Sequence, residues 1–388
     1  MTPARPGPGN PAPADRVTAV EVFFDLVFVF TLTQLTRVLE EDLSPAGLGK
    51  VLLLFGILWW MFDGYVWLAN HVPPRVPAQK LLLFVGMVGF LFAAVAVPAA
   101  FDGTGLLFGV GYLVVITVHL SLFTQAHIGS ALGRLAVYNL GSALLVLVGG
   151  LVDGAARYAC WLAALAVQSV VPYLVPRISW VRVLPLFRLQ PGHFVERHGL
   201  LVIIALGESV VAIGMGVDTA HVGAGTVAVI ALALALPAAL WWTYFTDTSG
   251  AEERLAATGT ERTRLALRVG FAHIPLLLGI VVAAAGIHAA VAHPGQPAGW
   301  RPALALAGGV AVYLAGIVGL RRTLHSAPVL SRLVTGAAVL ATVPVGTRLN
   351  ARAQLIALVL VLVVMLLLDR RGHATGRLAP AGGPGQDR

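Results

Sequence analysis

The 388-residue sequence contains little charge, few lysines and one cysteine. Only 11% of its residues are Asp, Glu, Lys or Arg, against about 25% in a typical soluble domain. Hydrophobic residues make up 58% of the chain. This composition excludes a soluble globular fold and makes the lipid bilayer the expected solvent. Because Cys160 is the only cysteine, an intrachain disulfide and a cysteine-based metal site are excluded as well.

Several functional motifs are also missing. The sequence has no HExxH pair, no CxxC and no histidine cluster at ligand spacing, so we expect neither a metal nor a cofactor. It has no GxxxxGK[ST] loop, which argues against ATP-driven transport by this chain alone. The basic residues lie in short segments between apolar runs and form no continuous basic face. Nucleic acid is therefore not an expected partner.

Long apolar stretches predict an all-α, polytopic membrane protein with about twelve transmembrane helices. A helix needs about 20 apolar residues to cross a hydrocarbon core of about 30 Å. Stretches of this kind occupy residues 17–39, 50–70, 80–101, 105–124, 134–152, 157–175, 197–217, 223–246, 266–292, 301–320, 329–347 and 353–369.

The basic residues predict the orientation, because Lys and Arg accumulate in cytoplasmic loops. With twelve spans, one side of the membrane carries only Arg37, Lys50, Arg157, Arg301, Arg348 and Arg352. The other 20 of the 26 Lys and Arg residues fall on the side of the two chain ends. We therefore expect both termini in the cytoplasm.

The two halves of the chain resemble each other weakly but in the same order. Residues 59–63 (WWMFD) resemble residues 241–247 (WWTYFTD), and residues 133–137 (GRLAV) resemble residues 331–335 (SRLVT). This order predicts two parallel six-helix repeats, although chance similarity between apolar helices is an alternative. The predicted parts are a disordered cytoplasmic tail at 1–16, a first repeat at 17–175, a cytoplasmic linker at 176–196, a second repeat at 197–371 and a second disordered tail at 372–388.

Ionisable side chains inside the predicted spans are the candidate transport and proton-binding groups, since the bilayer tolerates them only beside a partner, a cavity or water. Glu21 and Asp25 share a face of the first span. Asp63 on the second span lies at a depth comparable to that of Asp25, so these two carboxylates could approach each other or share an Arg. Glu208 is placed near the midplane, about 18 Å from the inner end of its span. His273 completes the set, because imidazole titrates near neutrality.

Two further groups of residues are candidates for a role, a charge network and a set of aromatic residues. Glu196, Arg197 and His198 are expected to form a charge network at the start of the seventh span. The aromatic residues could line a pore, but packing is the simpler explanation; they are Phe24, Phe28, Trp59, Trp60, Trp241 and Trp242. The buried acids have a structural alternative as well, because a neutral carboxyl group can join helices by hydrogen bonds.

Two segments resemble the signature segments of the bacterial low temperature requirement A family: EVFFDLVFVFTLTQLTRVL from Glu21 and HFVERHGLLVIIALGESVVAIG from His193. The matching positions are Glu21, Phe24, Asp25, Glu196, Arg197, Gly199, Gly207, Glu208 and Ser209. The resemblance covers roughly residues 16–371 and implies a multi-pass protein of the bacterial inner membrane. It implies no established biochemical activity.

A fainter likeness concerns the first segment alone. Residues 21–25 (EVFFD) are similar to the Phe-Ser-Asp motif that opens the first helix of two-repeat potassium channels of lysosomes and bacteria. Those channels usually repeat the motif, whereas residues 196–200 (ERHGL) contain no Asp. A symmetric pore of that design is therefore in doubt.

These observations favour a permease over an enzyme. The leading hypothesis is a transporter or channel-like protein that moves a small solute or ion between the two repeats, with protons as a coupling ion. Its expected partners are the lipid bilayer and that unidentified solute or ion, and a homo-oligomer stays open. One alternative is a membrane enzyme or sensor for a lipid-linked substrate, with Glu208, Ser209 and His198 on a cavity wall. The other is a structural membrane protein.

Overall fold

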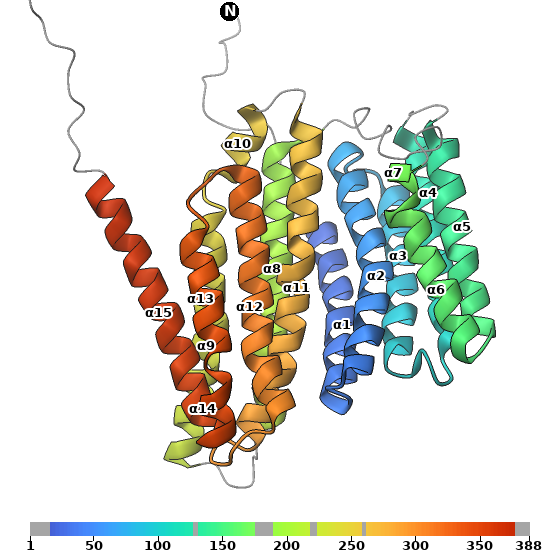
Figure 1. Cartoon of the computed structure of the whole chain (residues 1–388). Coiled ribbons are helices and arrows are strands. Elements are labelled where there is room, and N and C mark those ends of the chain that lie inside the picture. Colours follow the sequence, from blue (N-terminus) through green and yellow to red (C-terminus); the bar gives the residue numbers. More distant parts are fainter. Residues whose placement is uncertain (1–15, 127–130, 175–188, 218–222, 258–260, 377–388) are drawn as a thin grey trace, which may run out of the picture. The chain divides into compact units, whose positions relative to one another are not determined.

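The computed structural model describes residues 16–126, 131–174, 189–217, 223–257 and 261–376, and these parts of the chain contain helices and no strand (Figure 1). The first half contains α1 (Ala19–Glu41), α2 (Pro45–His71), α3 (Pro77–Ala96), η1 (Val97–Ala99), α4 (Gly105–Phe123), η2 (Thr124–Ala126), α5 (Ala131–Leu151), α6 (Gly154–Ser169) and α7 (Val171–Leu174). The second half contains α8 (Pro191–Gly216), α9 (Ala224–Asp247), α10 (Ala251–Ala257), α11 (Arg262–Ala292), α12 (Trp300–Leu324), α13 (Leu330–Leu340), α14 (Val343–Arg348) and α15 (Ala351–Gly376).

Within the described residues, ten helical segments are long and apolar enough to cross a membrane. They are α1, α2, α3 with η1, α4, α8, α9 with α10, α11, α12, α13 with α14, and α15. The predicted stretches 134–152 and 157–175 coincide with α5 and α6; the apolar part of α5 is Leu135–Leu151, and α6 has 16 residues. The all-α, multi-span architecture is therefore confirmed, whereas twelve spans and two repeats stay predictions. Most of the predicted tails and linker lies outside the described residues.

The chain divides into two compact units. Unit 1 comprises Met1–Glu208 and Ser249–Leu277, and unit 2 comprises Ser209–Thr248 and Leu278–Arg388. Of the three boundaries, two fall within helices, so α8 and α11 each contribute residues to both units.

In unit 1, local sequence signals define where the first helices begin. The carboxylate of Glu21 accepts hydrogen bonds from the backbone N–H and the hydroxyl of Thr18, which closes a capping box at the start of α1. Ser44 caps α2 by accepting from the N–H of Gly47. Successive helices from α3 to α6 then pack against one another (Figure 1).

An aromatic core joins the first three helices of unit 1. The rings of Phe28 and Phe62 stack with centroids 4.1 Å apart, and Phe24 packs against Tyr65 at 4.7 Å and Phe90 at 5.3 Å. Each of these five side chains is at most 1% exposed. These contacts set the antiparallel packing of α1 against α2, with α3 alongside.

The remaining predicted aromatic residues have two different environments. Trp59 is 4% exposed and stacks on Phe55, so it belongs to the interior of unit 1. Trp241 and Trp242 of α9 are 41% and 46% exposed on unit 2. Their exposure fits lipid-facing residues and not a pore lining within that unit.

In unit 2, small residues allow helices to approach closely. A Cβ atom at Gly279 would lie 2.7 Å from the carbonyl oxygen of Gly309, so the packing of α11 on α12 requires glycine there. Helices α9, α13 and α15 also pack against one another or against α12.

Candidate functional site

Arg197 of α8 is the centre of a buried charge cluster in unit 1. Its guanidinium donates from Nε and Nη2 to Oδ1 of Asp25, at 3.2 and 2.9 Å, and its Nη1 lies 3.5 Å from Oε1 of Glu21. All three residues are at most 1% exposed. The guanidinium carbon also lies over the rings of Phe24 and Phe62, 5.7 and 5.9 Å from their centroids. One turn of α1 therefore presents two carboxylates to one arginine.

A chain of hydrogen bonds orients the ring of His193. Asn70 accepts from the backbone N–H of Gln190 through Oδ1, so its Nδ2 is the group that faces the carbonyl oxygen of Gln190 and Nδ1 of His193. Nδ1 of His193 must then be an acceptor, and its Nε2–H donates to Oε1 of Glu21 at 3.0 Å.

Asp63 of α2 faces His198 of α8 beside this cluster. Oδ1 of Asp63 lies 4.0 Å from Nε2 of His198, and neither atom has a hydrogen-bond partner among the described residues. Nδ1 of His198 lies 2.9 Å from the carbonyl oxygen of Phe194, so it carries a proton and Nε2 of the neutral ring presents a lone pair. Two acceptors thus face each other unless a proton is bound on one of them. A Cβ atom at Gly270 would lie 3.2 Å from Oδ1, so glycine leaves room for the carboxylate.

His273 of α11 extends this group by one ring. Its Nδ1 lies 2.7 Å from the carbonyl oxygen of Val269, and its ring centroid is 4.5 Å from that of His198. Both imidazoles are at most 2% exposed. Two positive charges at this separation would repel each other, so the pair accommodates at most one proton beyond the neutral state.

The described charges of this cluster do not balance. Glu21, Asp25 and Asp63 supply three carboxylates, whereas Arg197 supplies one guanidinium, which leaves an excess of two negative charges when all are ionised. Oδ2 of Asp25 is buried and has no hydrogen-bond partner within the described chain. Because uncompensated charge is costly inside a membrane protein, these residues favour the uptake of protons or of a cation.

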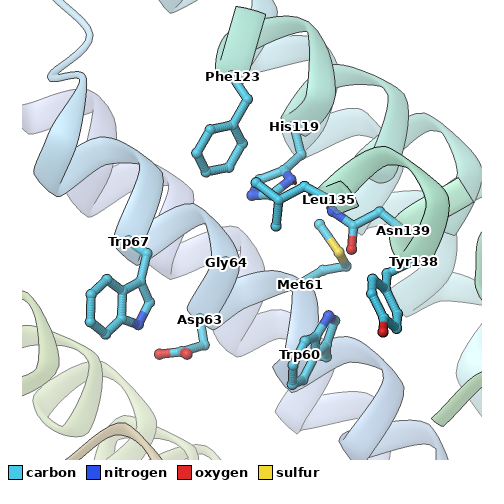
Figure 2. Close-up of a pocket in the computed structure, with 10 residues that line it drawn as sticks. All are labelled: Trp60, Met61, Asp63, Gly64, Trp67, His119, Phe123, Leu135, Tyr138 and Asn139. Atoms are coloured by element: carbon cyan, nitrogen blue, oxygen red, sulfur yellow. Dashed lines mark hydrogen bonds between the residues drawn. The ribbon is translucent and has the colours of Figure 1, made fainter. Parts of the chain in front are cut away.

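Asp63 also lines a cavity of about 60 Å³ between α2, α4 and α5 (Figure 2). Figure 2 shows Asp63 and Trp67 projecting from α2 on one side of Gly64, with His119 and Phe123 of α4 on the other side. The side chain of Asp63 is 23% exposed, in contrast to the closed environment of Asp25. Asp63 is therefore the acid of this cluster that also lines a cavity.

Glu208 does not join the cluster. Its Oε2 accepts a hydrogen bond of 2.6 Å from the hydroxyl of Thr33, eight residues beyond Asp25 and so about 12 Å further along α1. Because α8 begins at Pro191, Glu208 lies about 26 Å along the helix, beyond its middle. Among the described residues, Glu208 does not line the cavity beside Asp63. His198 is also about 15 Å from Glu208 along α8, too far for one wall of an enzyme site.

The other residue of the predicted charge network lies at the surface. The carboxylate of Glu196 accepts a hydrogen bond of 3.2 Å from the backbone N–H of Val17 in an exposed position. Of the three network residues, Arg197 and His198 therefore face the buried acids, and Glu196 does not. Within the described residues, no group of three or more His, Cys, Asp or Glu side chains could hold a metal ion.

Unit 2 contains a second buried charge cluster, which the sequence analysis missed. Asp247 of α9 accepts from Arg321 of α12 at 2.6 Å and from Arg332 of α13 at 3.0 and 3.1 Å. Arg332 also lies 2.6 Å from Asp369 of α15. Two acids and two arginines balance, which is typical of a structural junction. The alignment of residues 241–247 with residues 59–63 was the available signal, since it pairs Asp247 with Asp63.

The chain is similar to a known protein family and to a known bacterial protein. The sequence profile described as bacterial low temperature requirement A protein matches residues 16–367, which include every residue of both clusters except Asp369. A protein of Rhizobium meliloti (strain 1021) that is described as uncharacterized is 32% identical over 313 residues. That similarity covers 78% of this chain and 76% of the Rhizobium protein.

Proposed function

Because the chain belongs to the bacterial low temperature requirement A protein family, as its two signature segments predicted, we propose that it is a cation permease of the bacterial inner membrane. The proposed step is the binding and release of one proton between Asp63 and His198. Both chain ends are assigned to the cytoplasm on the distribution of Lys and Arg. No enzymatic reaction is part of this proposal.

The observation that carries the proposal is the geometry of Asp63 and His198. Their facing Oδ1 and Nε2 atoms lie 4.0 Å apart and lack other hydrogen-bond partners in the described chain. A distance of this size is too long for a direct hydrogen bond and fits a proton shared through one water. A purely structural pair would be expected to close to about 3 Å, as Glu21 and His193 do.

The neighbouring ion pairs give the two acids of the cluster different roles. Arg197 fixes Asp25 in place and joins α1 to α8, so Asp25 is a positioning residue. Asp63 is not tied to a guanidinium, and it borders the cavity. When the proton leaves, Asp63 carries a buried negative charge that favours the uptake of another cation. Protonation removes that charge, and this alternation is the basis of coupled transport.

Proton flux tests the proposal directly. The purified full chain is reconstituted in liposomes that contain a pH-sensitive dye, and a potassium diffusion potential drives protons inward. We expect measurable flux for the wild-type protein and a loss of at least about tenfold in Asp63→Asn and His198→Gln, the size of effect typical of a lost proton-transfer group.

Two exposed residues provide matched controls. Asp102→Asn changes an acid in the turn before α4, and His293→Gln changes a histidine after α11. Both should conduct protons as the wild type does. Equal flux in all five proteins, at equal reconstitution and thermal stability, would contradict the proposal and would favour a structural role for the buried acids.

A further inference from the structure

We propose that the cavity beside Asp63 binds a small alkylammonium cation that carries N–H groups. This inference rests on the proposed function, because the same carboxylate would serve the proton on its His198 side and the ammonium cation on its cavity side. It adds a substrate class and a mode of coupling to the permease.

The size of the cavity limits the ligand. Its volume is about 60 Å³, and one water requires about 10–15 Å³ on this measure, so the space corresponds to about four to six waters. A ligand of a few non-hydrogen atoms therefore fits. Nucleotides, sugars and lipid chains are too large for the cavity as it stands.

Four aromatic residues from three helices line the cavity. Trp60 and Trp67 come from α2, Phe123 from α4 and Tyr138 from α5 (Figure 2). Trp67, Phe123 and Tyr138 are only 3–4% exposed, so their rings are held by packing. The faces of aromatic rings carry negative electrostatic potential, and such cages are a known means of attracting ammonium groups.

The charge of the lining points to the same class of ligand. Asp63 is the only acid among the lining residues, and none of the lining residues that the structure describes is Lys or Arg. One negative charge at the edge of an aromatic cavity favours a monovalent cation over an anion or a neutral solute. Asp63 would be the counter-ion.

The lining contains two buried polar atoms without a partner among the described residues, and one of them, the hydroxyl of Tyr138, explains why N–H groups are needed. Nε2 of His119 and the hydroxyl of Tyr138 belong to side chains that are each 3% exposed, and neither atom has a hydrogen-bond partner within the described residues. A Cβ atom at Gly64 would lie 3.1 Å from Nε2 of His119, so glycine at this position leaves the ring room beside α2. The Tyr138 hydroxyl and the carboxylate of Asp63 can accept from an ammonium N–H group. Nε2 of His119 cannot, because it carries the ring proton when Nδ1 accepts from the side-chain amide of Asn139.

The placement of Asp63 between the two ligands implies exchange. A proton bound toward His198 neutralises the carboxylate and removes its attraction for the ammonium cation. By linkage, bound ammonium cation lowers the affinity of the site for the proton by the same factor. The site would therefore exchange one ammonium cation for one proton and keep the buried charge constant.

Calorimetric titration of the purified full chain with methylammonium chloride tests the inference. We expect saturable binding to the wild type, no binding to Asp63→Asn, and an affinity about tenfold lower in Trp60→Ala and about threefold lower in Tyr138→Phe. Trp300→Ala and Tyr158→Phe are matched controls, because these rings are 60% and 36% exposed, lie outside the cavity lining and should not affect binding. Tetramethylammonium, which has no N–H group, should bind more weakly than methylammonium.

Three results would overturn the inference: no methylammonium binding to folded wild-type protein, tighter binding of tetramethylammonium than of methylammonium, or equal competition by potassium ions. The proposed function has a separate readout, since His198→Gln is expected to abolish proton flux but to retain methylammonium binding. Failure of binding with an intact, Asp63-dependent proton flux would remove only the ammonium ligand. Binding without any proton flux would remove the permease proposal.

Discussion

At the scale of single residues, buried acids of similar chemistry differ in their partners. Asp25 receives two hydrogen bonds from Arg197, and Glu208 receives one from Thr33. Asp63 has neither a guanidinium nor a hydroxyl partner on Oδ1 among the described residues. Depth in the bilayer, which singles out Glu208 near the midplane, therefore does not by itself separate a functional acid from a structural one.

Glu208→Gln provides a prediction at this scale. A glutamine can keep the hydrogen bond to Thr33 through its amide oxygen. Thr33 lies about 12 Å along α1 from Asp25, so the substitution is remote from the cluster around Arg197. We expect proton flux within about twofold of the wild type and little change in thermal stability. Loss of flux in Glu208→Gln to the level of Asp63→Asn would show that the transport site includes the Thr33 region.

At the scale of helices, the positions of the elements could be predicted and the pairing of their polar side chains could not. Apolar runs of about 20 residues locate the helices, and the spacing of Glu21 and Asp25 correctly predicts a shared face. The start of α8 at Pro191 was missed, because residues 193–198 (HFVERH) are too polar to resemble a membrane span. They are helical because α1 and α2 supply their partners, Glu21, Asp25 and Asn70.

The cluster of unit 2 could not be predicted for the same reason. Asp247, Arg321, Arg332 and Asp369 come from four helices, and each pairing joins residues that are at least 37 positions apart. Such distant pairings leave no periodic pattern in one sequence. The balance of two acids and two bases nevertheless distinguishes this junction from the unbalanced cluster around Arg197, and this difference leads to a prediction about stability.

Arg332→Met is expected to destabilise unit 2 strongly. The side chain is 0% exposed, and its removal leaves Asp247 and Asp369 with one guanidinium in place of two. Breaking a buried ion pair from one side costs about 3–5 kcal/mol. Thermal unfolding in detergent should therefore show a clear loss of stability, whereas Arg322→Met, at an exposed position ten residues earlier, should unfold as the wild type does. Identical unfolding of both variants would show that the junction contributes no net stability.

At the scale of the whole molecule, the number of membrane crossings depends on α5 and α6. Ten spans and twelve spans both return the chain to its starting side, so the position of the termini cannot decide between them. Within unit 1, however, the turn between α5 and α6 lies beside the turn between α3 and α4. Arg157 donates to the carbonyl oxygen of Ala100 at 3.0 Å, and the rings of Phe101 and Tyr158 stack with centroids 4.7 Å apart. Because α3 and α4 are long enough to cross, we predict from these contacts that α5 and α6 cross as well.

Cysteine labelling of intact cells tests this topology. In a Cys160→Ser background, Asp102→Cys places a thiol in the turn before α4, and Ala155→Cys places one at the exposed start of α6. Arg75→Cys places one in the turn between α2 and α3. We expect a membrane-impermeant maleimide to label the first two from outside the inner membrane, and to label Arg75→Cys only after permeabilisation. The expectation follows from the bias of Lys and Arg toward the cytoplasm. Protection of Ala155→Cys while Asp102→Cys is labelled would mean that α5 and α6 do not cross, and the protein would then have ten spans.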